Sequence, residues 1–341
     1  LEHLDVALRL NADNLRALNL KALVLRRLGR DAEARQVIRA TLRIDPLDAW
    51  ALYQVGKGRR CDLQTAIDVA LDIARAGFYD EAIAQLGAAM KAGTRSRDPR
   101  NLGASPMAHY ALGWFRERAG DRTGAIASFR CAMKQPADHC FPSRLEEIAI
   151  LAAAIRANPS DARANHYLGC LLYDKRRHRE AIRLWDRASK LDPSFPTVWR
   201  NLGIGYFNIL NRPSRSRLAY ERAFRADPTD ARVLYERDQL WKRIGVRPEI
   251  RLKELMRHPR LVERRDDLTI ELCALYNQTG RHTDAARLLA VRRFQPWEGG
   301  EGQALGQYVR TQLALGRKAL LCGNAEEARG HFEAAMHPPN N

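Results

Sequence analysis

The feature that most constrains this chain is a pattern of small residues that recurs at a nearly fixed interval. Residues 161–194 show it most clearly, with Gly169 in one helical segment, Ala181 and Trp185 in a second, and Pro193 just after it. Small side chains at these positions let two antiparallel helices approach closely, because no larger group separates their backbones. The pattern predicts a helical hairpin as the repeating unit.

The spacing within residues 161–194 matches the tetratricopeptide repeat, which has a period of about 34 residues. We therefore predict an all-α, right-handed superhelical α-solenoid of stacked tetratricopeptide-type hairpins, since one hairpin alone cannot bury its apolar face. The repeat that begins near Trp199 has one extra residue at its turn. Other repeats are marked by Leu18, Ala22 and Gly29; Val69, Ala70 and Gly77; Leu112, Gly113 and Gly120; Leu202, Gly203 and Tyr220; Leu272, Tyr276 and Gly280; and Leu315, Gly316 and Gly323.

The same register suggests how the chain is organised. We expect N-terminal repeat units over residues 1–60 and a continuous stack of repeats over residues 61–341. Residues 7–11 align with the end of a second helix, so the chain is expected to start midway through a repeat and to be part of a longer protein. Segments rich in Gly, Pro and Ser predict irregular loops at 92–106, 134–144 and 294–303.

Composition and charge narrow the possible functions. No uninterrupted apolar stretch reaches the roughly 18 residues of a membrane span, and the six scattered cysteines are expected to be free thiols of a cytoplasmic protein. The formal net charge of +17 comes mainly from Arg residues that are interleaved with Asp and Glu. A coding bias explains that charge as well as a phosphate-binding surface does, so nucleic acid ranks below protein as the expected partner.

The sequence contains no constellation of residues typical of an enzyme. Side chains adjacent in a helix point about 100° apart, so an acidic doublet does not face a single scissile bond. The spacings of the common zinc, nucleophile and phosphate-binding motifs are also missing from the sequence. We expect no catalytic residue, no metal site and no cofactor. The acidic doublets are Glu146 and Glu147, Asp266 and Asp267, and Glu326 and Glu327.

Several strings are more distinctive than generic repeats. They are DVALDIARAGFYDEAI (68–83), CFPSRLEEIAIL (140–151), ANPSDARANHYLGCLLYDK (157–175), LDPSFPTVWRNLGIGYFN (191–208), DPTDARVLYERDQLWKRIG (227–245), RDDLTIELCALYNQTGR (265–281) and RRFQPWEGGEG (292–302). From about Ala66 onward, the chain resembles the C-terminal, tetratricopeptide half of large bacterial proteins with an N-terminal mutarotase-like β-sandwich domain of unknown function. That resemblance implies an association with carbohydrate metabolism, although the sandwich domain itself is not in this sequence. Ser216 departs from the pattern, because such repeats usually carry Ala there.

Resemblance to tetratricopeptide repeats also implies where a partner would bind. In such stacks the first helix of each hairpin lines a concave groove. Arg200 and Asn201, on one turn of such a helix, are suited to hold a carboxylate or a peptide carbonyl. The alternative is that these side chains only solvate the groove wall or pack against an upstream domain. The groove residues predicted in this way are Tyr110, Trp114, Arg163, His166, Tyr167, Tyr173, Arg200, Asn201, Asn208 and Tyr235. The same register adds Glu117, Arg118, Cys170, Asp174, Thr197, Ile204, Phe207, Arg232, Glu236, Gln239, Lys242 and Arg243.

Two loops are candidate docking elements. In the loop at 294–303, Trp297, Glu298 and Glu301 suit domain docking, and an ordinary inter-repeat loop is the alternative. Before the helix expected near residue 146, Arg144 and Glu147 are candidate interface residues. The simpler interpretation of that segment is a capping box, in which Ser143 caps the helix and Glu146 completes the box.

Taken together, the sequence predicts a scaffold that binds a protein, either its own N-terminal domain or another subunit. Two alternatives stay open. In the first, the groove completes a carbohydrate-active site together with the absent sandwich domain; in the second, the Arg residues bind nucleic acid. No membrane association is expected.

Overall fold

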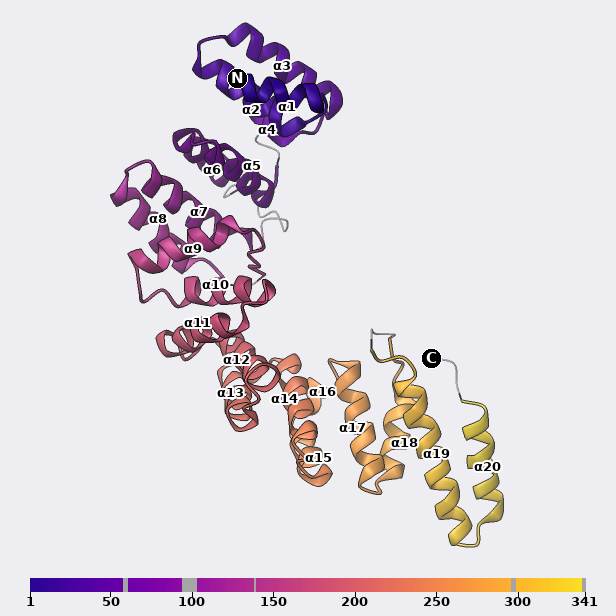
Figure 1. The fold of residues 1–341 in the computed structure, drawn as a ribbon. Helices are drawn as coiled ribbons and strands as arrows, with labels where there is room; N and C mark the ends of the chain where they lie inside the picture. Colours follow the sequence, from indigo (N-terminus) through magenta and orange to yellow (C-terminus); the bar gives the residue numbers. More distant parts are fainter. Residues whose placement is uncertain (58–60, 94–102, 138, 296–298, 339–341) are drawn as a thin grey trace. The chain divides into compact units, whose positions relative to one another are not determined.

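The computed structural model describes residues 1–57, 61–93, 103–137, 139–295 and 299–338 (Figure 1). Within these ranges the chain forms 20 helices and no strand, which confirms the all-α class. It divides into two compact units, Leu1–Asp192 and Pro193–Asn341, and each is described by itself. The division expected near residue 60 lies inside the first unit, beside residues outside the description. Parts of all three expected loops, at 94–102, 138 and 296–298, are also outside it.

The first unit is a series of antiparallel helical hairpins. Helix α2 packs against α3, α5 against α6, α7 against α8, and α10 against α11, while α9 lies against both α7 and α10. The helices are α1 (Glu2–Leu10), α2 (Leu15–Arg27), α3 (Asp31–Ile44), α4 (Ala49–Gln54), α5 (Leu63–Arg75), α6 (Tyr79–Gly93), α7 (Ala104–Arg118), α8 (Arg122–Lys134), α9 (Glu146–Ala157), α10 (Ala162–Asp174) and α11 (His178–Leu191).

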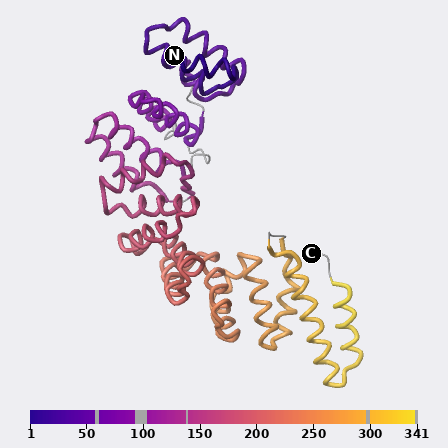
Figure 2. The backbone as a smooth tube through the Cα atoms, in the orientation of Figure 1, coloured from indigo at the N-terminus to yellow at the C-terminus, as the bar shows by residue number. Residues whose placement is uncertain are grey.

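The second unit continues the same construction, and successive helices reverse direction along it (Figure 2). The pairs are α12 with α13, α14 with α15, α17 with α18, and α19 with α20. The helices are α12 (Pro196–Asn208), α13 (Pro213–Ala226), α14 (Ala231–Arg243), α15 (Pro248–Met256), α16 (Pro259–Val262), α17 (Asp266–Gln278), α18 (His282–Val291), α19 (Gln303–Leu321) and α20 (Ala325–Met336).

One contact recurs at the centre of four hairpins. A glycine on the first helix faces an aromatic ring on the second, and a Cβ built on that glycine would lie 2.5 or 2.6 Å from a ring atom. The predicted role of Gly169, to leave room for the partner helix, is therefore confirmed. The four pairs are Gly113 with Phe129, Gly169 with Trp185, Gly203 with Tyr220, and Gly316 with Phe332.

The extra residue in the repeat near Trp199 is accommodated at the turn between α12 and α13. Asn211 adopts a left-handed conformation there, with φ of 49°, and Arg212 donates its backbone N–H to the Tyr206 carbonyl. Ser216, the residue that departs from the usual Ala, is buried and donates its hydroxyl to the Gly203 carbonyl at 2.7 Å. A small polar side chain is therefore tolerated because its single donor is satisfied.

Helix starts follow the sequence signals in most repeats. Proline occupies the first turn of α12, α13, α15 and α16, where its missing N–H costs no hydrogen bond. Side-chain oxygens cap other helices by accepting backbone N–H groups. The capping residues are Asn14, Asp48, Asp62, Asp121, Asp161 and Asp230.

The capping box predicted at α9 is wrong in its residues. Helix α9 begins at Glu146, and Leu145 is its N-cap without a side-chain hydrogen bond. The carboxylate that reaches back is that of Glu147, which accepts the backbone N–H groups of Ser143 at 2.7 Å and Arg144 at 2.8 Å. Because the helix starts later than expected, Glu146 is free to join an ion pair with Arg75 instead.

All six cysteines are free thiols. Among the described residues, none of the helices combines the length and the apolar character needed to cross a bilayer.

Candidate functional site

Two of the predicted groove residues belong to the core of the first unit. Tyr110 and Tyr167 are fully buried, and their rings meet edge to face at 6.2 Å. Tyr110 donates its hydroxyl to the buried carboxylate of Asp161 at 2.9 Å, and Asp161 also caps α10. Helix α9, which packs on both α7 and α10, adds a layer that simple repeat register does not include. The prediction that these tyrosines line an open groove is therefore wrong.

His166 is also buried, with 5% of its surface exposed. Burial, with a smaller contribution from Arg163, lowers the pKa of His166 to about 4, so its imidazole is neutral at pH 7. Trp185 donates its indole N–H to the His166 carbonyl at 3.3 Å, which fixes the backbone of α10 against α11. This histidine supports the hairpin rather than facing a partner, which corrects its assignment to the groove.

The remaining predicted residues of the first unit stay partly exposed. Trp114 packs edge to face against Tyr79 at 6.0 Å, and Tyr173 lies 5.2 Å from the ring of Trp185. Arg163 donates to the backbone carbonyl of Gln135. Each of them contacts neighbouring helices, and their role in binding stays a prediction.

The candidate interface residues Arg144 and Glu147 act within the chain. Arg144 forms ion pairs with two carboxylates of α5, Asp68 at 2.6 Å and Asp72 at 3.6 Å. Glu147 is 2% exposed, and burial raises its pKa above the ordinary value. These contacts attach the segment before α9 to α5, so neither side chain is available to an outside partner. This corrects the docking role expected for both.

In the second loop, Trp297 and Glu298 lie outside the described residues. Glu301 is exposed and lies just before α19. Its carboxylate accepts the backbone N–H of Gly299 at 3.2 Å.

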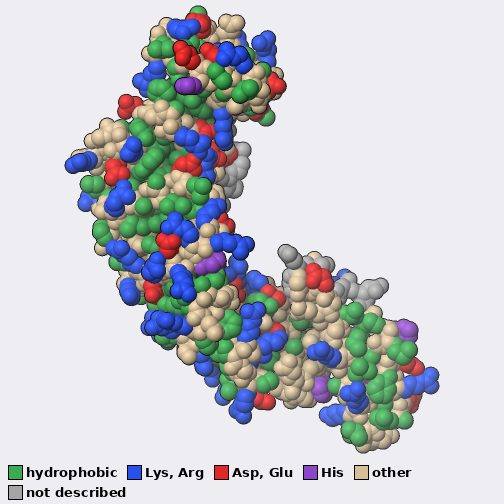
Figure 3. Space-filling view, viewed as in Figure 1, with side chains coloured by type: hydrophobic (Ala, Val, Ile, Leu, Met, Phe, Trp, Pro, Cys, Tyr) green, Lys and Arg blue, Asp and Glu red, His purple; other side chains and the backbone are tan. Residues whose placement is uncertain are grey.

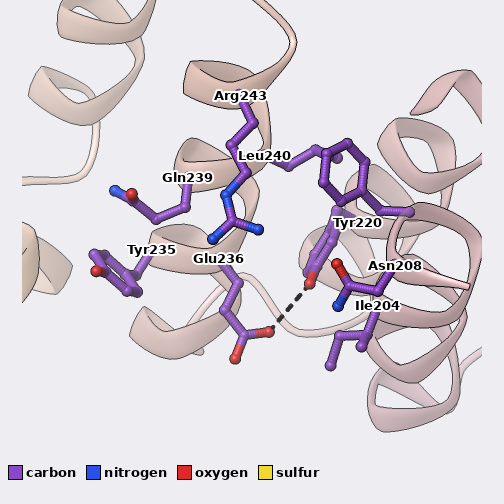
Figure 4. Close-up of a pocket in the computed structure, with 10 residues that line it drawn as sticks. Ile204, Asn208, Tyr220, Tyr235, Glu236, Gln239, Leu240 and Arg243 are labelled. Carbon is purple, nitrogen blue, oxygen red and sulfur yellow. Dashed lines mark hydrogen bonds between the residues drawn. The ribbon is translucent and has the colours of Figure 1, made fainter. Parts of the chain in front are cut away.

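The second unit contains a hollow of about 250 Å³ between α12, α13 and α14, which we call the first hollow. Figure 4 shows Asn208 and Arg243 extending into it from opposite sides, with Tyr220 between them, while Tyr235 and Gln239 extend from α14 away from Asn208. Asn201 does not line it. The predicted groove residues that do are Ile204, Phe207, Asn208, Tyr235, Glu236, Gln239 and Arg243. Its lining is Gly203, Ile204, Phe207, Asn208, Tyr220, Tyr235, Glu236, Gln239, Leu240 and Arg243.

Arg200 lies beside the first hollow but is already engaged. It donates both Nε and Nη2 to the carboxylate of Glu236, at 2.7 and 2.5 Å, and so joins α12 to α14. Arg232 and the Tyr220 hydroxyl donate to the same carboxylate, at 3.0 and 3.4 Å. The expected clamp by Arg200 on an external carboxylate is therefore wrong, because Glu236 occupies the guanidinium.

Arg243 is the cation that faces the first hollow. Its guanidinium lies 6.0 Å from the centre of the Phe207 ring, and among the residues that the structure describes it forms no ion pair. Burial raises the pKa of Tyr220, so its hydroxyl keeps its proton beside this cation. The first hollow thus combines one exposed cation with amide and aromatic side chains.

A second hollow, of about 320 Å³, lies between α14, α17 and α19. Arg310 lines it, is exposed, and forms no ion pair within the described ranges. Lys242 also lines it and donates to both carboxylate oxygens of Glu271, at 3.0 and 3.1 Å. The full lining of the second hollow is Lys242, Ile270, Glu271, Ala274, Glu301, Gly302, Gln303, Gly306, Gln307 and Arg310.

A buried ion network joins Glu271, which lines the second hollow, to side chains of α14 and α15. Arg251 on α15, 2% exposed, donates to Asp238 at 2.7 Å and to Glu271 at 2.6 Å. Burial acts to raise the pKa of Glu271, but hydrogen bonds from Arg251 and Lys242 together bring it below the ordinary value. The network therefore holds Glu271 ionised and fixes α14, α15 and α17 to one another. The described residues contain no group of three or more His, Cys, Asp or Glu side chains placed to hold a metal ion.

Sequence reasoning missed the contribution of α17 and α19. Gln307 and Arg310 lie in the first turns of α19, which begins at Gln303, well ahead of the Leu315-Gly316 marker used to recognise that repeat. The signal that could have found them is the unusual length of this helix, 19 residues against 13 in α10, α12, α14 and α17.

The fold and the two hollows define the class of protein: a stack of helical hairpins whose first helices present a recessed polar and aromatic surface. A family model of the tetratricopeptide repeat matches residues 1–49, 70–137 and 168–231, more than half of the chain. The chain belongs to the tetratricopeptide repeat family.

Solved structures with a similar arrangement include MamA from Desulfovibrio magneticus RS-1, which is 13% identical, with 60% of this chain and 97% of MamA covered and a TM-score of 0.34. YrrB, described as a tetratricopeptide repeat protein with an unusual peptide-binding site, is 17% identical over 68% of this chain and 96% of its own, with a TM-score of 0.27. A tetratricopeptide repeat protein from Parabacteroides merdae is 15% identical over 82% and 94%, with a TM-score of 0.35.

Proposed function

We propose that this chain is a scaffold that binds an extended segment of a partner protein along α12, α14, α17 and α19. The observation that carries the proposal is that two hollows share helix α14, which contributes Arg243 to the first and Lys242 to the second. A partner segment that occupies one hollow is thereby brought to the edge of the next. Recessed surfaces with a few polar groups are where proteins bind ligands.

The chemistry of the lining suits a peptide backbone. Amide side chains donate and accept hydrogen bonds at once, as a peptide's own N–H and C=O groups require. The first hollow offers Asn208 and Gln239, and the second offers Gln303 and Gln307. Phe207 and Tyr235 provide apolar area for the partner's side chains.

The resemblance to large bacterial proteins supports one class of partner. In that family the repeats follow a mutarotase-like domain, so we propose that the bound segment belongs to the upstream region of the same polypeptide or to another subunit. An association with carbohydrate metabolism would then come through that region. The charged side chains of this chain do not argue for a nucleic-acid surface here, because Lys and Arg are distributed over the visible face with Asp and Glu among them (Figure 3).

Selection from a phage-displayed library of random linear peptides tests the proposal, with two matched glycine variants. Gly306 in α19 lines the second hollow and Gly330 in α20 does not, and both have open space where a Cβ would lie. Peptides selected on the unmodified chain should lose binding to Gly306→Trp and keep it with Gly330→Trp. Equal binding to both variants, or selection of no peptide, would show that a partner segment does not occupy the second hollow and would contradict the proposal.

A further inference from the structure

We infer that the outer faces of α13 and α15, the second helices of two successive hairpins, bind the surface of an anionic lipid bilayer. This surface lies outside both hollows and goes beyond the proposed function, so either one can fail without the other. Its cations are Arg215, Arg222, Arg225 and Lys253, and its aliphatic side chains are Leu218, Ile250 and Met256.

The segment that forms α13 is strongly basic. Residues 212–226 contain five arginines and a single acidic residue, Glu221. One arginine, Arg217, pairs with the Glu221 carboxylate at 2.9 Å and neutralises it. The other four are exposed and form no ion pair with any residue that the structure describes; they are Arg212, Arg215, Arg222 and Arg225.

Three of these arginines share one side of α13 with an exposed leucine. That side carries, in order, Arg215, Leu218, Arg222 and Arg225. Steps of three and four residues keep side chains on one side of a helix. The buried residues of α13 lie on its other side, against α12, so this row faces solvent. Leu218, in the middle of the row, is 47% exposed.

Rings of α12 support two of the guanidinium groups. Arg222 lies over the Trp199 ring at 4.6 Å, and Arg215 lies over the Tyr206 ring at 6.0 Å. Stacking limits the orientations of both cations and leaves their outer side open to an anion. Both rings are themselves buried beneath the arginines, so they are not open for a nucleic-acid base to stack on.

Helix α15 extends the surface. The Phe224 ring near the end of α13 meets the His258 ring, just after α15, edge to face at 5.0 Å, so these ends of the two helices adjoin. Helix α15 exposes Ile250 and Met256, by 46% and 44%, with the exposed Lys253 between them in sequence. Cations and aliphatic side chains are therefore mixed on both helices.

The charge of this surface is positive. Its four cations have no carboxylate partner among the described residues. Against them stands Glu249, in the first turn of α15, which is exposed and also has no ion-pair partner within the described ranges. The other carboxylates of the two helices, Glu221 and Glu254, are paired with arginines.

An anionic bilayer matches this surface because it accommodates both kinds of side chain. Headgroup phosphates attract guanidinium and ammonium groups, and aliphatic side chains enter the interface beneath the headgroups. A nucleic acid would neutralise the arginines but would bury the aliphatic side chains against phosphates and sugars. The expectation of no membrane association rested on the lack of a spanning stretch, and a contact at the bilayer surface requires none.

Co-sedimentation of the intact chain with extruded vesicles tests the inference. One set of vesicles consists of phosphatidylcholine alone, and the other also contains phosphatidylglycerol. The chain should bind the vesicles that contain phosphatidylglycerol and not the others, and should bind them more weakly as salt is added, since salt screens exposed charges. Failure to bind the anionic vesicles at low salt would overturn the inference.

Two variants with the same change in net charge locate the contact. The first, Arg215→Gln with Arg222→Gln and Arg225→Gln, should weaken vesicle binding on the order of a hundredfold, about fivefold for each arginine. The control replaces three cations of residues 292–321 that are exposed and form no ion pair within the described residues; it carries Arg293→Gln, Arg317→Gln and Lys318→Gln.

The control should bind vesicles almost as tightly as the unmodified chain. Equal weakening in the two variants would show that overall charge, and not the face of α13, drives binding, and would overturn the inference. Circular dichroism should show the same helicity in both variants, because all the replaced side chains are exposed. Peptides selected for the hollows should bind both variants alike, so the proposed function is tested separately.

Leu218→Ala separates a bilayer from a soluble polyanion. It should weaken binding to the anionic vesicles roughly fourfold to fifteenfold, which corresponds to one or two buried CH₂ groups. Binding of polyuridylate should not change in this variant. Vesicle binding that is indifferent to Leu218→Ala, or release of the chain from vesicles by an equal charge of polyuridylate, would overturn the bilayer as the occupant.

Discussion

Gly169 on α10 lies directly against Trp185 on α11, so that a Cβ on the glycine would fall 2.5 Å from the indole nitrogen. The indole is 3% exposed and donates to the His166 carbonyl, so it cannot move aside without losing a hydrogen bond. The same contact between a glycine and a ring closes three other hairpins. The hairpin is therefore defined by a shape match that a single methyl group disrupts.

The first prediction follows from this contact. Gly169→Ala should destabilise the first unit by about 1–3 kcal/mol, because overpacking at Trp185 exceeds the gain in helix propensity. Gly330→Ala, a helical glycine with open space around it, should instead stabilise by about 0.5–1 kcal/mol. Urea unfolding followed by circular dichroism measures both, and a stabilising Gly169→Ala would contradict the packing described here.

A second prediction concerns the pair that joins α12 to α14. The Arg200 and Glu236 side chains are 17% and 19% exposed and form two parallel hydrogen bonds. Arg200→Met and Glu236→Gln should each lower the free energy of unfolding by about 1–2 kcal/mol, since each removes one charged member of a partly buried pair that forms two parallel hydrogen bonds. A double-mutant cycle should show that the two effects are not additive. Additive effects would mean that the two side chains do not interact in solution.

The buried network gives a larger effect. Arg251→Met should destabilise the second unit by about 3–5 kcal/mol, because it leaves the buried carboxylate of Asp238 without its arginine partner and leaves Glu271 with Lys242 alone. Arg225→Met, on an exposed arginine, is the control and should change stability by less than about 0.5 kcal/mol. Thermal unfolding of the two variants measures the difference in stability. Similar melting temperatures would show that the network contributes little to the stability of the second unit.

The pH dependence of the first unit should report on His166. Its folded pKa of about 4 lies below the ordinary value of 6.5, so the unfolded chain binds more protons between these two values. Stability from the neutral imidazole is therefore complete above pH 6.5 and is lost as the pH falls toward 4, up to about 3 kcal/mol. His166→Gln should flatten the difference in stability between pH 7 and pH 5. An unchanged slope in that variant would assign the pH dependence to other groups.

The parts of this structure that sequence could predict are those set by local register. The closeness of Gly169 and Trp185 follows from their separation along one hairpin, and a stack of such hairpins follows from its recurrence. Tyr110 and Tyr167 occupy register positions that face a groove in a regular stack. They are buried here, where their rings meet and Tyr110 donates to Asp161 of a later repeat, and the sequence of their own repeats does not signal these contacts.

For a related reason, the sequence could not predict which charged side chains of the candidate site are already paired. The sequence of α12 alone suggests that Arg200 is free to donate to a ligand. Its partner Glu236 lies 36 residues later in the chain, on α14. Only the packing of α12 on α14 shows that the first arginine is occupied and that Arg243 is the one left exposed. Likewise Arg251, Asp238 and Glu271 come from three helices, and their separate sequences do not show that they meet.

Hydrogen–deuterium exchange of the whole chain, with and without a selected peptide, tests the central claim most directly. Slower exchange on binding should appear in α12, α14, α17 and α19 of the second unit, the helices that line the two hollows. Protection confined to the first unit, or to α15, α18 and α20, would contradict the assignment of this surface as the binding site.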